Sequence, residues 1–182
     1  MTVQGLAEVC AELDRLQIRY VVVGGVAIEE EGYGIGTQDV DVLVGARDYD
    51  PALKKLRDSA MVKWAEDAEG MATVEFVVNH QTVDVDVIDT TIFSGKLTDA
   101  DAFVRFVRRE ASVEVDGVRY AKAPVIWYMR LTCPDWPVYA EKIRRDIAFG
   151  VPAKYLHDVL KIAERFGLGD EVRSRVQTLQ AS

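Results

Sequence analysis

The chain contains Gln38-Asp-Val-Asp-Val-Leu-Val44, a β-branched apolar strand that carries two aspartates. Alternate side chains of an extended strand point to the same face, so Asp39 and Asp41 lie together and oppose the valines. An unpaired carboxylate in a buried sheet costs on the order of several kcal/mol. The stretch therefore indicates a strand whose acidic face is functional. The alternative is an edge strand whose acidic face is simply solvated.

A second stretch, Thr82-Val-Asp-Val-Asp-Val-Ile88, repeats this pattern with Asp84 and Asp86 on one face. If the two strands pair, three or four carboxylates gather at one place. Carboxylates that are crowded in this way resist ionising together unless a cation joins them. Oxygen ligands without histidine or thiolate favour Mg²⁺ or Mn²⁺, and such a group can bind two ions about 3.5–4 Å apart.

A glycine pair precedes the first acidic strand. Tyr20-Val-Val-Val23 is a short β-branched run that predicts a buried strand, and Gly24-Gly25 follows it where a helix begins. Backbone N–H groups exposed at such a junction can bind the phosphates of a nucleotide. A phosphate-binding turn followed by two acidic strands supplies the parts that two-metal phosphoryl or nucleotidyl transfer uses.

These motifs together resemble the nucleotidyltransferase fold of the polymerase beta superfamily, in particular its minimal nucleotidyltransferases and abortive-infection toxins. The resemblance covers residues 20–90 and is carried by Gly24-Gly25, Thr37-Gln-Asp-Val-Asp41-Val-Leu and Val-Asp-Val-Asp86-Val-Ile. It implies an α/β (α+β) protein with a mixed sheet and a C-terminal helical extension. It also implies NTP binding by Gly24, Gly25 and Thr37, binding of Mg²⁺ (or Mn²⁺) by Asp39 and Asp41, and Asp86 as a third metal-binding and catalytic carboxylate, with Asp84 as the alternative.

The implied activity is metal-dependent transfer of a nucleoside monophosphate from an NTP to a hydroxyl group. The acceptor classes are a tRNA 3′ end, a protein side chain and a small molecule. Ile35 stands where related sequences often carry arginine. This departure keeps a second hypothesis open, a catalytically inactive nucleotidyltransferase-like module that works with a small partner protein in a two-gene toxin–antitoxin or defence pair.

Basic residues are concentrated between residues 105 and 145, away from the acidic strands. In the family that the chain resembles, a lysine or arginine from the helical extension contacts the triphosphate. The candidates for this role are Arg130, Lys142 and Arg144, which spacing alone does not rank.

The order of elements predicts two parts. Strand patterns and hairpin signals, including Asn79-His-Gln81 and Asp116-Gly117, occur up to residue 123, and helical patterns follow to the end. We therefore expect a sheet-containing core over residues 1–123 and a helical tail packed on it over residues 124–182.

Composition excludes several other classes. The chain has 182 residues, with 22 Lys+Arg against 30 Asp+Glu and a net charge of −8, which argues against a whole-surface grip on nucleic acid or anionic lipid. Cys10 and Cys133 lack metal-ligand spacing and are expected to be reduced core thiols. No apolar run approaches a membrane span or a signal peptide. We expect a cytoplasmic protein without a membrane partner.

Overall fold

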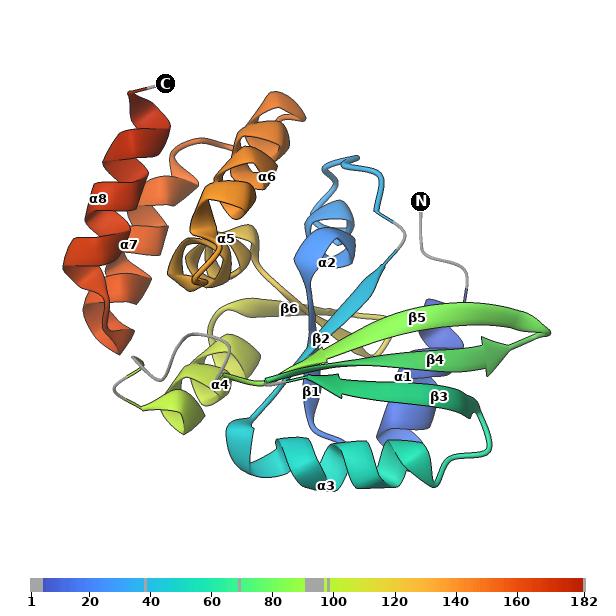
Figure 1. Ribbon diagram of the computed structural model, residues 1–182. Helices are drawn as coiled ribbons and strands as arrows, with labels where there is room; N and C mark the ends of the chain where they lie inside the picture. Colours follow the sequence, from blue (N-terminus) through green and yellow to red (C-terminus); the bar gives the residue numbers. More distant parts are fainter. Residues whose placement is uncertain (1–4, 38, 69, 91–96, 98, 182) are drawn as a thin grey trace.

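The computed structural model describes residues 5–37, 39–68, 70–90, 97 and 99–181. Over these residues it contains a seven-stranded mixed sheet in the order β3-β4-β5-β2-β1-β7-β6 (Figure 1). The strands are β1 (Tyr20–Val23), β2 (Val40–Val44), β3 (Val62–Ala68), β4 (Met71–Val78), β5 (Gln81–Ile88), β6 (Ser112–Val115) and β7 (Val118–Ala121). The predicted mixed sheet is confirmed.

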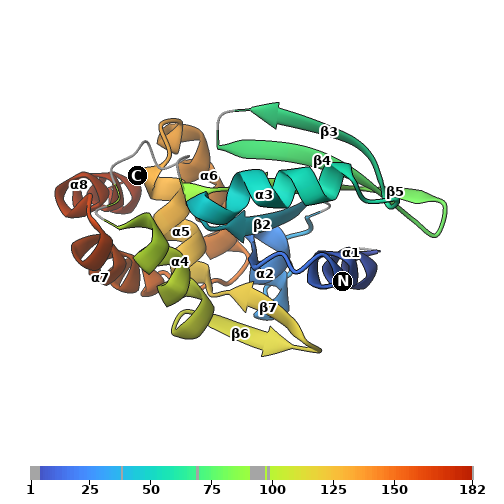
Figure 2. The ribbon, with the colours of Figure 1, turned by 90° about the horizontal axis from the view of Figure 1, so that it is seen from below.

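Helices accompany the sheet on both sides. They are α1 (Leu6–Arg15), α2 (Gly24–Glu30), α3 (Ala46–Arg57), α4 (Ala100–Arg109), α5 (Ala123–Thr132), α6 (Trp136–Ala148), α7 (Tyr155–Phe166) and α8 (Gly169–Gln180). Helices α1 and α3 cover one face of the strands β3 to β5, and α5–α8 gather on the other side of the molecule (Figures 1 and 2). The C-terminal helical extension is likewise confirmed.

The two acidic strands are neighbours. β2 and β5 run parallel, and their register places Asp41 directly opposite Asp86. On its other edge β2 pairs antiparallel with β1, where Val23 lies opposite Asp41. This pairing places the C-terminal end of β1, and Gly24-Gly25 directly after it, at the same end of the strands as the aspartates.

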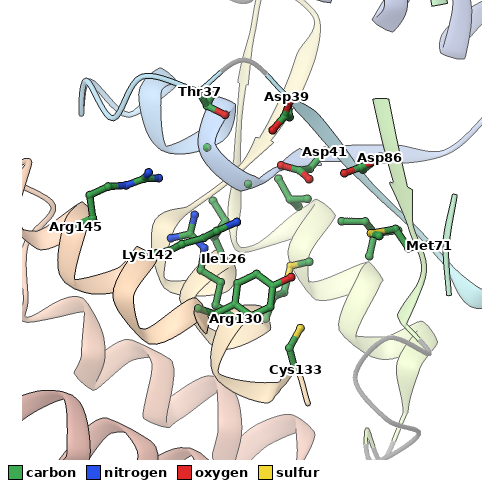
Figure 3. Close-up of a pocket in the computed structure, with 16 residues that line it drawn as sticks. Thr37, Asp39, Asp41, Met71, Asp86, Ile126, Arg130, Cys133, Lys142 and Arg145 are labelled. Carbon is green, nitrogen blue, oxygen red and sulfur yellow. The ribbon is translucent and has the colours of Figure 1, made fainter. Parts of the chain in front are cut away.

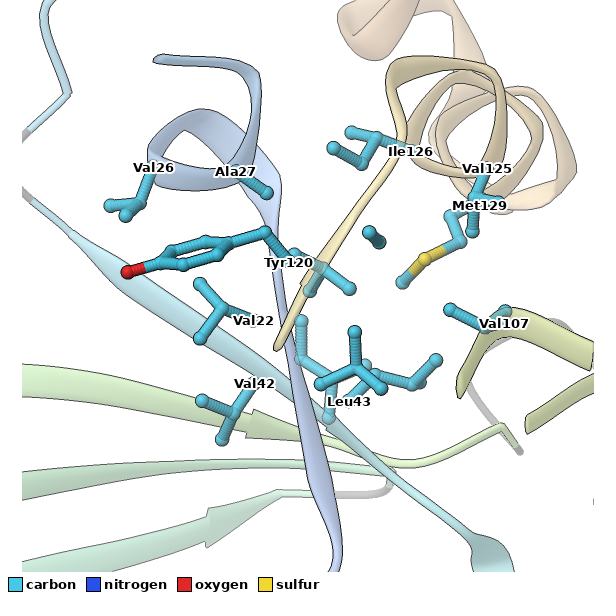
Figure 4. Packing of buried hydrophobic residues seen from close by; sticks show 14 of the residues in the cluster. Val22, Val26, Ala27, Val42, Leu43, Val107, Tyr120, Val125, Ile126 and Met129 are labelled. Carbon is cyan, nitrogen blue, oxygen red and sulfur yellow. The ribbon is translucent and has the colours of Figure 1, made fainter. Parts of the chain in front are cut away.

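The buried core is continuous from the sheet to the first C-terminal helix. Val22 and Val42 of the central strands and Tyr120 of β7 lie in one cluster with Ile126 and Met129 of α5 (Figure 4). Apolar burial of this kind contributes roughly 25 cal/mol per Å². Helix α5 is therefore part of the same core as the sheet, and the proposed boundary between residues 123 and 124 crosses that core.

Two hairpins form where the sequence predicts them. Asn79 and His80 have φ values of 50° and 66°, and Asp116 and Gly117 have 49° and 81°. Two successive positive φ values are the mark of a type I′ turn, whose twist matches that of the flanking strands. The first loop has two residues rather than three, because Gln81 already belongs to β5.

The two cysteines are buried and free, as expected. No helix in the described part of the chain is long and apolar enough to cross a membrane.

Candidate functional site

A pocket of about 250 Å³ lies where β1, β2 and β5 meet α5 and α6 (Figure 3). Its polar lining includes most of the residues that the sequence singles out. The lining residues that bear on function are Gly24, Gly25, Thr37, Asp39, Asp41, Asp86, Arg130, Tyr139, Lys142 and Arg145.

Three carboxylates form one side of this pocket. Neighbouring strands lie about 4.8 Å apart, so the register of Asp41 and Asp86 places their carboxylates side by side, and Asp39 lies two residues before Asp41 on the same face (Figure 3). Asp86 accepts a hydrogen bond of 2.7 Å from the Thr73 hydroxyl of β4. Asp84, the alternative third carboxylate, is solvent-exposed and does not line the pocket.

The surroundings of Asp41 disfavour the ionised form of its carboxyl group. Burial, the charge of Asp86 and, less strongly, that of Asp39 raise the pKa of Asp41 to about 7, while the positive charges of Lys142 and Arg130 act in the opposite direction. An ionised Asp41 is therefore costly in this place. A cation bound between the carboxylates would remove that cost.

Because Gly24 and Gly25 have no Cβ, the start of α2 can lie close to Asp41 of β2 and to the loop that carries Thr37. A Cβ on Gly24 would lie 1.8 Å from Asp41 Oδ2, and a Cβ on Gly25 would lie 2.6 Å from the Cβ of Thr37. Gly24 also has a φ of +67°, which favours glycine. The Thr37 loop is held there because Glu29 of α2 accepts hydrogen bonds from the amides of Gly36 and Thr37. Helix α2 begins at Gly24 itself, so the pair forms its first turn rather than a loop before it.

The close contact at Gly25 makes a stability prediction. Replacing a helical glycine by alanine normally stabilises a protein by roughly 0.5–1 kcal/mol, but Gly25→Ala is expected to destabilise this one by about 1–3 kcal/mol because Thr37 must move. Urea unfolding measures the change. Adding Thr37→Gly should recover most of it, and Gly34→Ala, where nothing lies within 4 Å of the new Cβ, is the matched control. A neutral or stabilising Gly25→Ala would contradict the packing described here.

Basic side chains of α5 and α6 face the carboxylates across the pocket (Figure 3). The Lys142 ammonium lies over the Tyr139 ring at 5.1 Å from its centroid. The Arg130 guanidinium is only 8% exposed and forms an ion pair with Asp146, which is fully buried. Arg130 is thus already neutralised, whereas Lys142 forms no salt bridge in the part of the chain that the structure describes.

The structure places Arg144 outside this pocket. Its guanidinium pairs with Glu141 on the surface of α6, and Arg145 lines the pocket instead. Tyr139, Lys142 and Arg145 follow one another at intervals of three residues, so one face of α6 presents all of them. That spacing is the signal by which sequence reasoning could have found Tyr139 and Arg145.

The donor atoms suit a hard divalent cation. Asp39, Asp41 and Asp86 offer only carboxylate oxygens, the ligands that Mg²⁺ and Mn²⁺ prefer. Among the described residues no three His, Cys, Asp or Glu side chains form a ready-made metal cage. Mg²⁺ commonly keeps several waters and takes part of its coordination from substrate phosphates, so one or two carboxylates per ion suffice. The residues present therefore fit such an ion.

No protein-family model matches this chain, and no curated protein matches it either. Among solved structures, the chain is similar to the crystal structure of a protein from Thermotoga maritima described as a putative nucleotidyltransferase. The two are 13% identical, the match covers 81% of this chain and 96% of that chain, and the TM-score is 0.47.

Proposed function

We propose that this protein is a metal-dependent nucleotidyltransferase that moves a nucleoside monophosphate from an NTP to a hydroxyl group. The observation that supports this is a single pocket with carboxylates of two parallel strands on one side and Lys142 and Arg145 of α6 on the other. The negative carboxylates match the metal ion of a metal–triphosphate complex, and the positive side chains match its phosphates.

The carboxylates take two roles in this proposal. Asp39, Asp41 and Asp86 would hold Mg²⁺ or Mn²⁺, which when bound neutralises the phosphoryl oxygens and polarises the α-phosphorus. Asp86 also accepts the proton of the acceptor hydroxyl, and the hydrogen bond from Thr73 fixes the orientation of its carboxylate. The acceptor oxygen forms a bond to the α-phosphorus as the bond from that phosphorus to the bridging oxygen breaks, and pyrophosphate leaves.

The other pocket residues bind the nucleotide. Lys142 and Arg145 contact the triphosphate, and Gly24, Gly25 and Thr37 border it where no Cβ blocks the approach. Arg130 adds little net charge because Asp146 already neutralises it, and we propose that it shapes the wall of the pocket instead.

The two basic residues of α6 provide a test with an internal control. Lys142→Ala and Arg145→Ala are each expected to weaken binding of Mg·NTP about 10- to 100-fold, because a hydrogen bond to a charged group contributes about 1.5–3 kcal/mol. Arg144→Ala, on the same helix but outside the pocket, should leave affinity within about twofold. Isothermal titration calorimetry measures all three. Equal losses for Arg144 and Arg145 variants would contradict the assignment.

Transfer itself is tested with α-labelled NTPs. The protein is incubated with each NTP, Mg²⁺ and separate tRNA, protein and small-molecule fractions of a cell lysate, and the label is followed into each fraction. Labelling of one fraction that Asp41→Asn abolishes and Asp84→Asn leaves intact is the expected result. The absence of Asp41-dependent label from every fraction would count against catalysis.

One observation favours a second candidate, a nucleotide-binding module without catalysis. Ile35 is 5% exposed and packs in the core, so the loop before Thr37 offers an apolar side chain where a basic one would aid transfer. Mg·NTP binding without transfer, together with a tight complex with a small partner protein, would favour this candidate. No detectable Mg·NTP binding would exclude both.

A further inference from the structure

A second polar pocket lies at the opposite end of β1 from the carboxylates. β1 and β7 run parallel, with Val22 opposite Tyr120, so Arg19, just before β1, comes beside the β6–β7 hairpin. The ends of α1 and α4 and one side of α3 complete the walls. The pocket measures about 580 Å³, and its charged lining residues are Asp14, Arg19, Lys55, Arg108, Glu114 and Arg119.

Positive charge exceeds negative charge in this lining. Four side chains are basic, those of Arg19, Lys55, Arg108 and Arg119, and two are acidic, those of Asp14 and Glu114. The chain as a whole has a net charge of −8. A local excess of cations on an acidic protein is therefore a specific feature of this pocket rather than a consequence of composition.

Two of the four cations are used within the fold. Arg119 donates to Glu114 at 2.6 Å and to the main-chain carbonyl of Arg108. Lys55 donates to the carbonyl of Leu16 at 2.8 Å, at the C-terminal end of α1. In the described part of the chain the guanidinium groups of Arg19 and Arg108 form neither a hydrogen bond nor an ion pair.

Arg108 is the less exposed of these two. Its Nε is buried and finds no hydrogen-bond partner among the described residues. Burial, together with the positive charges of Arg119 and Arg19, lowers the pKa of its guanidinium, and the charge of Asp48 offsets this only in part. A partly buried guanidinium among like charges is costly unless an anion compensates it.

We propose that this pocket binds the phosphoryl group of a small phosphate ester of nucleotide size, with Arg19 and Arg108 as its ligands. The planar guanidinium fork matches phosphate oxygens in bidentate fashion. A volume of about 580 Å³ lies within the roughly 300–1,000 Å³ range of small-molecule sites. The site is separate from the carboxylate pocket, so it does not depend on the proposed transferase activity.

In the test, the 182-residue protein is titrated with inorganic phosphate, pyrophosphate and AMP in EDTA at low ionic strength. Binding is measured by calorimetry and ³¹P NMR. EDTA chelates divalent cations and so prevents metal-dependent binding at the carboxylates. We expect binding of at least one probe, weakened about tenfold or more by Arg19→Gln and by Arg108→Gln. Arg108→Lys, which keeps the charge without the fork, should recover only part of the affinity.

Two controls locate the binding. Arg109→Gln, at an exposed position next to Arg108 on α4 and outside the pocket, should bind like the wild type, as should Lys142→Ala in the other pocket. Thermal unfolding without probe checks that each variant folds. The proposal is overturned if no probe binds at millimolar concentration, if Arg109→Gln loses as much affinity as Arg108→Gln, or if Lys142→Ala abolishes binding. It is also overturned if single-stranded RNA binds but none of the small probes does, since that result identifies an RNA surface.

Discussion

Replacing Asp146 by Ala is expected to lower the free energy of unfolding by about 3–5 kcal/mol, because removing one partner of a buried ion pair leaves the other charge uncompensated. Asp146 has no exposed surface, and Arg130 is 8% exposed. Asp146 also accepts a hydrogen bond of 2.9 Å from Trp127 Nε1. The substitution therefore removes the partner of both a buried guanidinium and a buried indole N–H. Urea unfolding, followed by tryptophan fluorescence and far-UV circular dichroism, measures the loss.

The double variant Arg130→Met/Asp146→Ala separates the ion pair from other effects. A buried pair often contributes little net stability compared with apolar residues of similar volume, and Asp146 Oδ1 has no hydrogen-bond partner among the residues that the structure describes. The double variant should therefore be much more stable than Asp146→Ala alone. Additive losses in this double-mutant cycle would show that Arg130 and Asp146 do not interact.

The strand pair at the centre of the candidate site could be predicted because its signal is local. Alternation with a period of two assigns Asp39 and Asp41 to one face whatever the rest of the chain does. The same holds for Asp116-Gly117, which by itself favours a type I′ hairpin. Sequence reasoning also anticipated a site on paired acidic strands, but the parallel register of Asp41 and Asp86 required the structure.

Other features could not be predicted because they depend on tertiary contacts. β3 reads Val-Lys-Trp-Ala-Glu-Asp-Ala, a charged composition that resembles a loop and is tolerated because β3 is an edge strand. Helix α3 begins at Ala46 and contains Pro51, although Asp50-Pro51 favours a helix start at that point. In both cases packing overrides the local preference.

The choice between Arg144 and Arg145 shows the limit most clearly. A shift of one residue turns a side chain by 100° around a helix, so the face that α6 presents to the pocket cannot be assigned without knowing how α6 packs against α5. A sequence shows which charges are available. Only the packing shows which of them face the pocket.

Replacing Asp41 by Asn is expected to have opposite effects on stability and on function. Burial and the charge of Asp86 raise the pKa of Asp41 to about 7 in the folded protein, whereas an unfolded chain has an aspartate pKa near 4. The folded state therefore binds the proton more tightly, and the metal-free wild type loses stability as pH rises from about 4 to about 7. At pH 8 the variant should be more stable by roughly 2–4 kcal/mol, since each pH unit corresponds to about 1.4 kcal/mol. Below pH 4 the two should be equally stable.

Mg²⁺ with a nucleotide should reverse this order. A ligand that binds only the folded state stabilises it, so Mg·NTP should raise the unfolding free energy of the wild type at pH 8 and leave that of Asp41→Asn unchanged. Asp84→Asn, at an exposed position of the same acidic motif, is the control and should respond like the wild type. A variant that is less stable than the wild type at pH 8, or one that Mg·NTP still stabilises, would contradict the assignment of Asp41. With the expected result, the protein maintains a destabilising carboxylate where only a bound cation makes it favourable, which is the behaviour of a residue retained for function rather than for folding.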